Sequence, residues 1–174
     1  MLEVLILYIL LRRDYTMYSI QKQILENFGA YTNPSFGAIK PALVRLEKNQ
    51  FISSVKIMSD GGKLSVFYSI TKEGQKHLQN SILEPSTSNP LQFFSDSRIR
   101  LSCLSAVDKN YHNVVFEDIM QIAQIHKANA EKILNDEYNP LTFYQKIILD
   151  NTICEYKNFM SLLENLEKED ARNS

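Results

Sequence analysis

The sequence has no tryptophan, two cysteines, three histidines and five glycines among its 174 residues. Cys103 and Cys154 are too far apart for a C-x-x-C pair, and a chain of this size with two cysteines is typical of a reduced, intracellular protein. The histidines lack the spacing of a metal site, and no glycine-rich phosphate loop is present. We therefore expect no cofactor, no metal and no enzymatic activity.

Long apolar segments are also missing. Residues 2–11 are mostly apolar, but a bilayer-spanning helix needs about 20 such residues. The charges of Arg12, Arg13 and Asp14 follow this segment, which is the reverse of their order in a signal peptide. We interpret residues 2–12 as a buried helix and expect a cytoplasmic protein.

Charge is unevenly distributed along the chain. The net charge is only −1, and a hydrophobic content of 44% is typical of a folded globular protein. Residues 1–83 contain 10 Lys and Arg against 6 Asp and Glu, whereas residues 84–174 contain 9 against 14. The basic front half could contact phosphate and the acidic back half should avoid it. Chance variation is the alternative explanation.

Two further helices are predicted before residue 50. Thr16 is placed to cap a helix that runs to about Phe28, and Gly29 is a natural stop. After a turn, Ser35 can cap the next helix, which ends near Asn49. Pro41 lies inside this last helix, where a proline costs about 3 kcal/mol or more. Either the helix begins later, near Ala38, or its first turn is distorted.

The helix after Ser35 has two distinct faces. Its apolar stripe is predicted to consist of Phe36, Ile39, Leu43 and Leu46. The opposite front carries Gly37, Lys40, Pro41, Val44 and Lys48, with Arg45 on its flank. A helix with a buried back and a low, cationic front can enter the DNA major groove, which is about 12 Å wide.

A strand pair follows this helix. Val55 and Ile57 alternate with polar residues, and residues 64–70 alternate again after a predicted turn at residues 60–62. Thr71 can cap a short helix with Gly74 in its first turn. Three helices followed by a two-stranded ribbon predict a winged helix-turn-helix domain over residues 1–83.

The second half of the chain is predicted to be helical. Residues 84–90 contain two prolines and no apolar side chain except Pro itself, which marks a linker before a domain at 91–174. Helices are expected at about 114–138 and 140–169, with Pro140 starting the second and a tight joint that makes an antiparallel hairpin. A lone hairpin cannot bury its apolar faces, so we expect dimerisation. Packing only on the N-terminal domain is the alternative.

The front half resembles the PadR family of bacterial transcriptional regulators. Residues 6–11 resemble the family's first helix, and residues 35–47 resemble its Ser-x-Gly-x-Ile-Tyr-Pro-Ala-Leu-x-Arg-Leu-Glu segment. Residues 67–74 resemble its Tyr-Tyr-x-Leu-Thr-x-x-Gly wing end. Lys40 replaces the usual Tyr, and Met17 replaces the Gly that precedes Tyr18. The resemblance covers about residues 2–80, and beyond it only the helical layout matches.

The resemblance implies a mainly helical fold with a β-hairpin wing and an antiparallel helical dimerisation region. It also implies a homodimeric repressor of a double-stranded DNA operator that a small aromatic or hydrophobic effector releases. The chain lacks the tryptophan that some drug-binding relatives use. The candidate DNA-binding residues are Tyr18, Ser35, Lys40, Arg45, Lys48 and Lys63.

Two alternatives remain beside DNA binding. A winged helix can serve as a protein-interaction module that does not bind DNA, although Lys40, Arg45 and Lys48 retain a basic front. A redox role for Cys103 or Cys154 is a weaker option, because Cys154 is expected to be inertly buried near the apolar side of the last helix. The aromatic residues of the back half could line an effector pocket, but aromatic side chains at helical spacing more often form a core.

Overall fold

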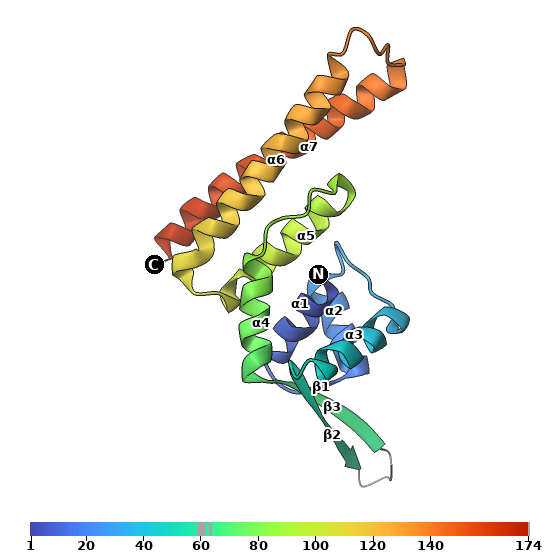
Figure 1. The fold of residues 1–174 in the computed structure, drawn as a ribbon, viewed down its shortest axis with the longest axis vertical. Helices are drawn as coiled ribbons and strands as arrows, with labels where there is room; N and C mark the ends of the chain where they lie inside the picture. The colour runs from blue at the N-terminus through green and yellow to red at the C-terminus, as the bar shows by residue number, and fades with distance from the viewer. Residues whose placement is uncertain (59–61, 63, 174) are drawn as a thin grey trace. The chain divides into compact units, whose positions relative to one another are not determined.

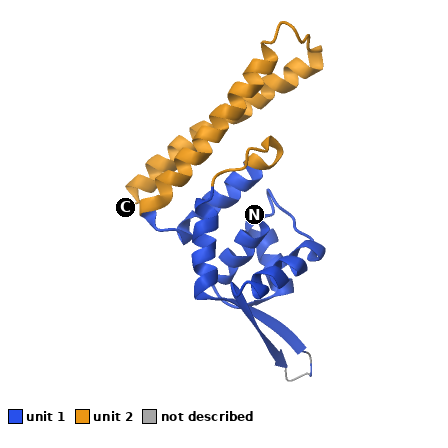
Figure 2. Ribbon diagram, viewed as in Figure 1, with its two compact units in different colours: residues 1–84, 94–109 blue, residues 85–93, 110–174 orange. Residues whose placement is uncertain are grey.

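The computed structural model describes residues 1–58, 62 and 64–173, which form two compact units (Figure 2). The first unit comprises residues 1–84 and 94–109, and the second comprises residues 85–93 and 110–174. Across the described part of the chain, no helix combines the length and apolarity needed to cross a membrane.

The first unit contains the predicted winged helix-turn-helix (Figure 1). Its elements are α1 (Leu2–Leu10), β1 (Tyr15–Thr16), α2 (Met17–Phe28), α3 (Phe36–Lys48), β2 (Ile52–Met58), β3 (Leu64–Ile70) and α4 (Lys72–Leu83). The strands form an antiparallel sheet in the order β1-β3-β2, with Val55 opposite Phe67 in the register of the hairpin. The predicted strand pair is confirmed, and the two-residue strand β1 is an addition that the sequence did not predict.

Apolar side chains of the helices form the core of this unit. Leu5, Ile6 and Leu7 of α1 are fully buried, as expected for a helix that is apolar on nearly every side. The predicted stripe of α3 is confirmed at its Ile and Leu positions, which are buried. The inclusion of Phe36 was wrong, because this side chain is 40% exposed, whereas Ala42 is buried. Helical geometry places Ala42 beside the Ile and Leu positions.

Two threonine caps fix where helices begin. The Thr16 hydroxyl accepts a hydrogen bond from the Ser19 N–H at 3.2 Å, which confirms the predicted start of α2. The Thr71 hydroxyl likewise accepts from the Gly74 N–H at 3.0 Å at the start of α4. The Thr71 N–H donates to the Phe51 carbonyl, so this cap also holds α4 against the residue that precedes β2.

Helix α5 (Pro90–Ser102) and the 3-10 turn η1 (Leu104–Ala106) were not predicted. From residue 94 onward this segment belongs to the first unit and is tied to it by polar contacts. The hydroxyls of Ser102 and Tyr31 are 2.7 Å apart, and Arg100, which is 2% exposed, donates from Nε to the Ile82 carbonyl at 2.9 Å. The side chain of Asn89 accepts from the Leu91 N–H and helps to start the helix.

The second unit contains an antiparallel pair of long helices, α6 (His112–Leu134) and α7 (Phe143–Arg172), with the short turn η2 (Lys109–Tyr111) leading into α6. The predicted hairpin is confirmed, but the predicted start of its second helix at Pro140 was wrong. Thr142 caps α7 instead, and its hydroxyl and backbone form a reciprocal capping box with Gln145. This local pair of hydrogen bonds specifies the start more strongly than the preceding proline.

Apolar residues of the hairpin are unevenly buried. The buried set is Val115, Phe116, Ile119, Ala123 and Ala130 on α6 and Ile153, Tyr156, Phe159 and Leu163 on α7. The first turns of α7 leave large apolar side chains exposed, namely Phe143, Tyr144, Ile147 and Ile148. Cys154 is exposed and Cys103 is buried, so the expected burial of Cys154 was wrong.

Candidate nucleic-acid interface

Helix α3 presents the predicted low, basic front. Its exposed positions are Gly37, Lys40, Pro41, Val44, Arg45 and Lys48. A side chain at Gly37 would meet only the Ser35 hydroxyl, at 3.5 Å, so open space lies in front of the helix there. Lys40 and Lys48 form no ion pair with the residues that the structure describes. The front of α3 therefore carries two lysines without ion-pair partners among the described residues, on a surface with few protruding side chains.

Pro41 lies inside α3, which begins at Phe36. The alternative start near Ala38 is therefore excluded. The Ser35 carbonyl accepts from both the Ala38 and the Ile39 N–H at 3.0 Å, so the first turn combines two hydrogen-bonding patterns. Because proline has no N–H, the usual helical bond to the carbonyl of Gly37 cannot form. That carbonyl belongs to the exposed front.

Tyr18 and Ser35 lie near the beginnings of α2 and α3. The ring of Tyr18 is stacked on that of Phe36, with centroids 6.1 Å apart and planes 18° from parallel. Tyr18 is nevertheless exposed, so its hydroxyl is accessible. Ser35 occupies the predicted N-cap position, but its side chain makes no capping hydrogen bond. Both hydroxyls are thus available to an external acceptor.

Arg45 is already paired. Its Nε donates to Oε1 of Glu3 on α1 at 2.7 Å, and the arginine side chain remains 59% exposed. An ion pair at such an exposed site is worth only about 0.2–1 kcal/mol, since water screens both charges. A DNA phosphate could therefore compete with Glu3 for this guanidinium at little cost.

An acidic residue lies at the end of α3. The Ser54 hydroxyl of β2 donates to a carboxylate oxygen of Glu47, which connects the helix to the wing. Partial burial, together with the negative charge of Glu47, raises the pKa of Tyr68 on β3. Tyr68 therefore stays protonated and can serve as a hydroxyl donor at neutral pH.

The wing formed by β2 and β3 is more apolar than the sequence reading anticipated. Its exposed apolar side chains are Val55, Ile57, Met58 and Leu64. Because side chains alternate along a strand, Met58 and Leu64 lie on one face as a directly opposed pair, with Lys56 next to them on that face.

The remaining candidate, Lys63, and the turn predicted at residues 60–61 lie outside the described residues.

The ion pair of Arg45 was not predictable from the sequence, since Glu3 is 42 residues away. No local signal joins the two residues. The exposure of Val55 and Ile57 was not predictable from the sequence, because their alternation with polar residues does not show which face of the hairpin is covered. No three His, Cys, Asp or Glu side chains in the described part of the chain gather into a group that could hold a metal ion.

The order of helices and strands, with an exposed basic third helix, defines a winged helix-turn-helix protein. The sequence profile of the PadR-like family of transcriptional regulators matches residues 6–80. A PadR family transcription regulator from Clostridium difficile is 30% identical over 46% of this chain and 81% of its own, with a TM-score of 0.41. The chain belongs to the PadR family of transcriptional regulators.

Two further solved structures are also similar to this chain. A transcriptional regulator from Clostridium thermocellum is 29% identical, covering 45% of this chain and 76% of its own, with a TM-score of 0.42. Bacillus subtilis PadR in complex with operator DNA is 18% identical, covering 95% and 97% of the two chains, with a TM-score of 0.46. Comparison with curated proteins finds no match.

Proposed function

We propose that this regulator is a cytoplasmic homodimer that represses transcription by binding double-stranded operator DNA through residues 1–83. The observation that carries the proposal is the front of α3, where Lys40 and Lys48 are exposed without ion pairs to the described residues. A cationic helix of low relief suits both the negative potential and the width of the major groove.

Each candidate residue has a proposed role on DNA. Lys40 lies in the middle of the front and would reach guanine edges or phosphates, while Lys48 would contact the backbone. The accessible hydroxyls of Tyr18 and Ser35 would donate to phosphate oxygens, which fix register and carry no sequence information. Arg45 would exchange Glu3 for a phosphate or base edge. We propose that Lys63, in the wing, contacts the minor groove or its phosphates.

Dimerisation is assigned to residues 91–174, with residues 84–90 as the linker. The exposed Phe143, Tyr144, Ile147 and Ile148 support this assignment, since one α7 presents four large apolar side chains in two turns. A two-fold dimer presents two α3 helices, which would read half-sites about one helical turn, roughly 34–36 Å, apart. A small aromatic or hydrophobic effector would release the DNA.

Fluorescence anisotropy with labelled duplex DNA from upstream of the chain's own gene tests the proposal. The affinity is measured across a salt series and compared with that for a scrambled duplex. Lys40→Ala is the test variant and Lys76→Ala is the matched control, because Lys76 is an exposed lysine on α4 in the same unit.

The proposal requires the upstream duplex to bind about a thousandfold more tightly than the scrambled duplex. It also requires a log–log salt slope that corresponds to several phosphate contacts. Lys40→Ala should weaken specific binding by about tenfold, since a good base contact discriminates by about 1–3 kcal/mol. Equal loss in Lys76→Ala would show that only net charge matters and would contradict the assignment to α3.

A second candidate function is a protein-interaction module that does not bind DNA. The exposed apolar wing favours it, since Val55 and Ile57 lie on one face of the hairpin and the opposed pair of Met58 and Leu64 lies on the other. Salt separates the two functions. Phosphate contacts weaken steeply as salt rises, whereas an apolar contact with a protein does not.

A further inference from the structure

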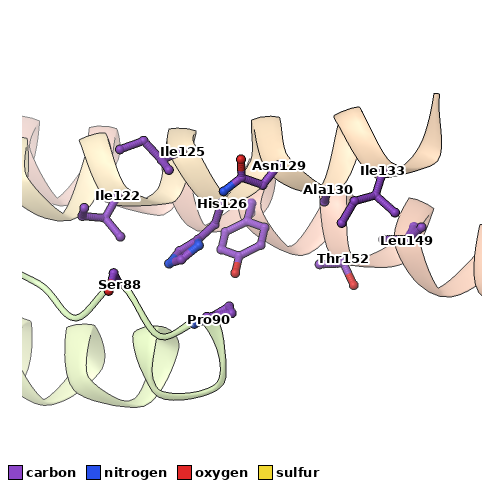
Figure 3. A pocket seen from close by; sticks show the side chains of 11 residues that line it. Ser88, Pro90, Ile122, Ile125, His126, Asn129, Ala130, Ile133, Leu149 and Thr152 are labelled. Atoms are coloured by element: carbon purple, nitrogen blue, oxygen red, sulfur yellow. The ribbon is translucent and has the colours of Figure 1, made fainter. Parts of the chain in front are cut away.

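A cavity of about 400 Å³ lies in the second unit, between α6, α7 and the segment that carries Ser88 and Pro90 (Figure 3). Its volume falls within the range of about 300–1,000 Å³ that is usual for small-molecule sites. Most of its wall is aliphatic and includes Ile122, Ile125, Ile133 and Leu149. An apolar molecule would therefore replace water there favourably.

One polar residue of this wall, His126, has a buried ring nitrogen that could bind a ligand. His126 is 8% exposed, and its buried Nε2 atom has no hydrogen-bond partner among the described residues. In Figure 3 its imidazole points from α6 toward the segment that carries Ser88 and Pro90. Leaving a buried nitrogen without a partner is unfavourable, and a ligand that hydrogen-bonds to it would recover part of that cost.

Aromatic neighbours hold this imidazole in place. The ring of Phe93 meets it edge to face at a centroid distance of 5.2 Å, and the ring of Tyr156 lies 5.7 Å away. Burial also lowers the pKa of His126, so the ring is neutral near pH 7. A neutral imidazole offers one donor and one acceptor according to its tautomer, and a hydroxyl group can satisfy either.

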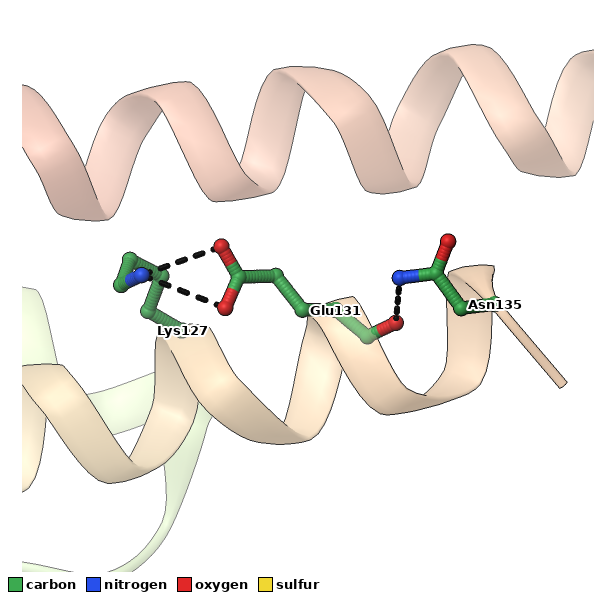
Figure 4. A network of polar contacts seen from close by, with 3 residues as sticks. All are labelled: Lys127, Glu131 and Asn135. Carbon is green, nitrogen blue, oxygen red and sulfur yellow. Dashed lines mark hydrogen bonds and ion pairs between the residues drawn. The ribbon is translucent and has the colours of Figure 1, made fainter.

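Charge argues against an acidic ligand. Among the described residues that line the cavity, none is Lys, Arg, Asp or Glu. Lys127 follows His126 in sequence, but its ammonium donates to both carboxylate oxygens of Glu131, at 3.0 and 3.2 Å (Figure 4). No lining cation is therefore available to offset the desolvation of a carboxylate, which is large without a partner.

We propose that this cavity binds a small, uncharged, largely apolar molecule through one hydroxyl group that hydrogen-bonds to Nε2 of His126. The inference deepens the effector part of the proposed function and rests on it only for the consequence on DNA. Binding itself requires nothing beyond the second unit. The uncharged lining of the cavity also specifies the chemistry of the effector, since it disfavours acids of the same size.

The test is a titration of the full-length protein with 2-naphthol, followed by the fluorescence of the naphthol. The chain has no tryptophan, so its own emission interferes little. Naphthalene lacks the hydroxyl group and 2-naphthoate carries a charge, so together they probe the two chemical requirements. A parallel measurement records whether 2-naphthol releases duplex DNA.

Three variants locate the binding. His126→Phe keeps an aromatic ring but removes Nε2, and Ala130→Leu fills the cavity from α6. His77→Phe is the matched control, because His77 is stacked on Phe51 in the first unit. Thermal melts verify that each variant is folded, and Leu149→Phe replaces Ala130→Leu if the latter is not.

The proposal expects 2-naphthol to bind the wild type and the His77→Phe control alike. Binding should weaken by about tenfold in His126→Phe, through the lost hydrogen bond, and by at least as much in the filled variant. Naphthalene and 2-naphthoate should each bind at least about tenfold more weakly than 2-naphthol. The proposal fails if 2-naphthol does not bind, if His126→Phe and the filled variant bind as the wild type does, or if 2-naphthoate binds as tightly.

The DNA measurement separates this result from the proposed function. Binding of 2-naphthol at His126 without any effect on DNA would support the site and contradict release by this class of effector. Failure of the protein to bind any DNA would contradict the proposed function and leave the ligand titration interpretable.

Discussion

Gly74→Ala is expected to destabilise the first unit, although alanine is normally the better helix former. Gly74 lies in the first turn of α4, where replacing glycine would ordinarily gain about 0.5–1 kcal/mol. Here an added Cβ would lie 1.9 Å from the Phe51 carbonyl oxygen and 3.0 Å from Cγ1 of Ile70. The first contact is with backbone, so the chain before β2 must move.

Two costs set the size of the effect. Overpacking costs about 1–3 kcal/mol. Moving the Phe51 carbonyl also weakens its hydrogen bond from the Thr71 N–H, 3.0 Å long, which is worth about 0.5–1.5 kcal/mol. After subtraction of the helix gain, the free energy of unfolding should fall by about 2 kcal/mol. The thermal midpoint should fall by about 4–8 °C in a protein of this size.

Gly37→Ala provides a control of opposite sign. Gly37 also lies in the first turn of a helix, but its added Cβ would make only one ordinary contact, with the Ser35 hydroxyl. This variant should be unchanged or more stable by up to about 1 kcal/mol. Thermal and urea unfolding, followed by circular dichroism, measure both. If Gly74→Ala were as stable as Gly37→Ala, the close approach at Phe51 would be refuted.

Four further results are expected. Glu3→Gln should raise DNA affinity by up to about fivefold at low salt, because the arginine on α3 loses its competing carboxylate; unchanged affinity would show that this arginine does not contact DNA. Cys154 should react with a thiol reagent in the folded protein and Cys103 only after unfolding, because burial raises the pKa of Cys103 to about 12. Ile148→Asp should convert a dimer into a folded monomer in analytical ultracentrifugation, since this exposed side chain lies on the proposed interface. Burial lowers the pKa of His126, so the unfolded state binds its proton more readily and stability should fall as pH drops below about 6.5. The thermal midpoint of the wild type should therefore fall more between pH 7 and 5 than that of His126→Phe.

Local patterns predicted the parts of the candidate interface that depend on one helix. The spacing of Ile39, Leu43 and Leu46 specified which side of α3 is buried, and the exposed position of Lys40 follows from it. The partner of Arg45 was not predictable in this way, because an ion pair between α1 and α3 depends on how the two helices pack. Long-range polar contacts of this kind leave no periodic trace in a sequence.

Errors in the helical second half have similar causes. Pro140 suits the start of a helix, but the reciprocal hydrogen bonds of Thr142 and Gln145 favour a later one. Helix α5 was missed for two reasons. Its first turn overlaps a segment rich in proline and serine, and its Arg100 and Phe93 become buried only through tertiary contacts. Propensity alone could not anticipate that environment.

Under the proposed function, the ion pair between Glu3 and Arg45 would affect how the protein searches DNA for its operator. In the proposed function, the carboxylate would weaken each contact of this guanidinium with random phosphates by the small worth of an exposed ion pair, about 0.2–1 kcal/mol, so encounters with the wrong sequence would be up to about fivefold shorter. At the right sequence, a well-placed phosphate or base can displace the carboxylate. A single acidic residue on α1 would thereby shorten the search while leaving the final complex nearly as tight.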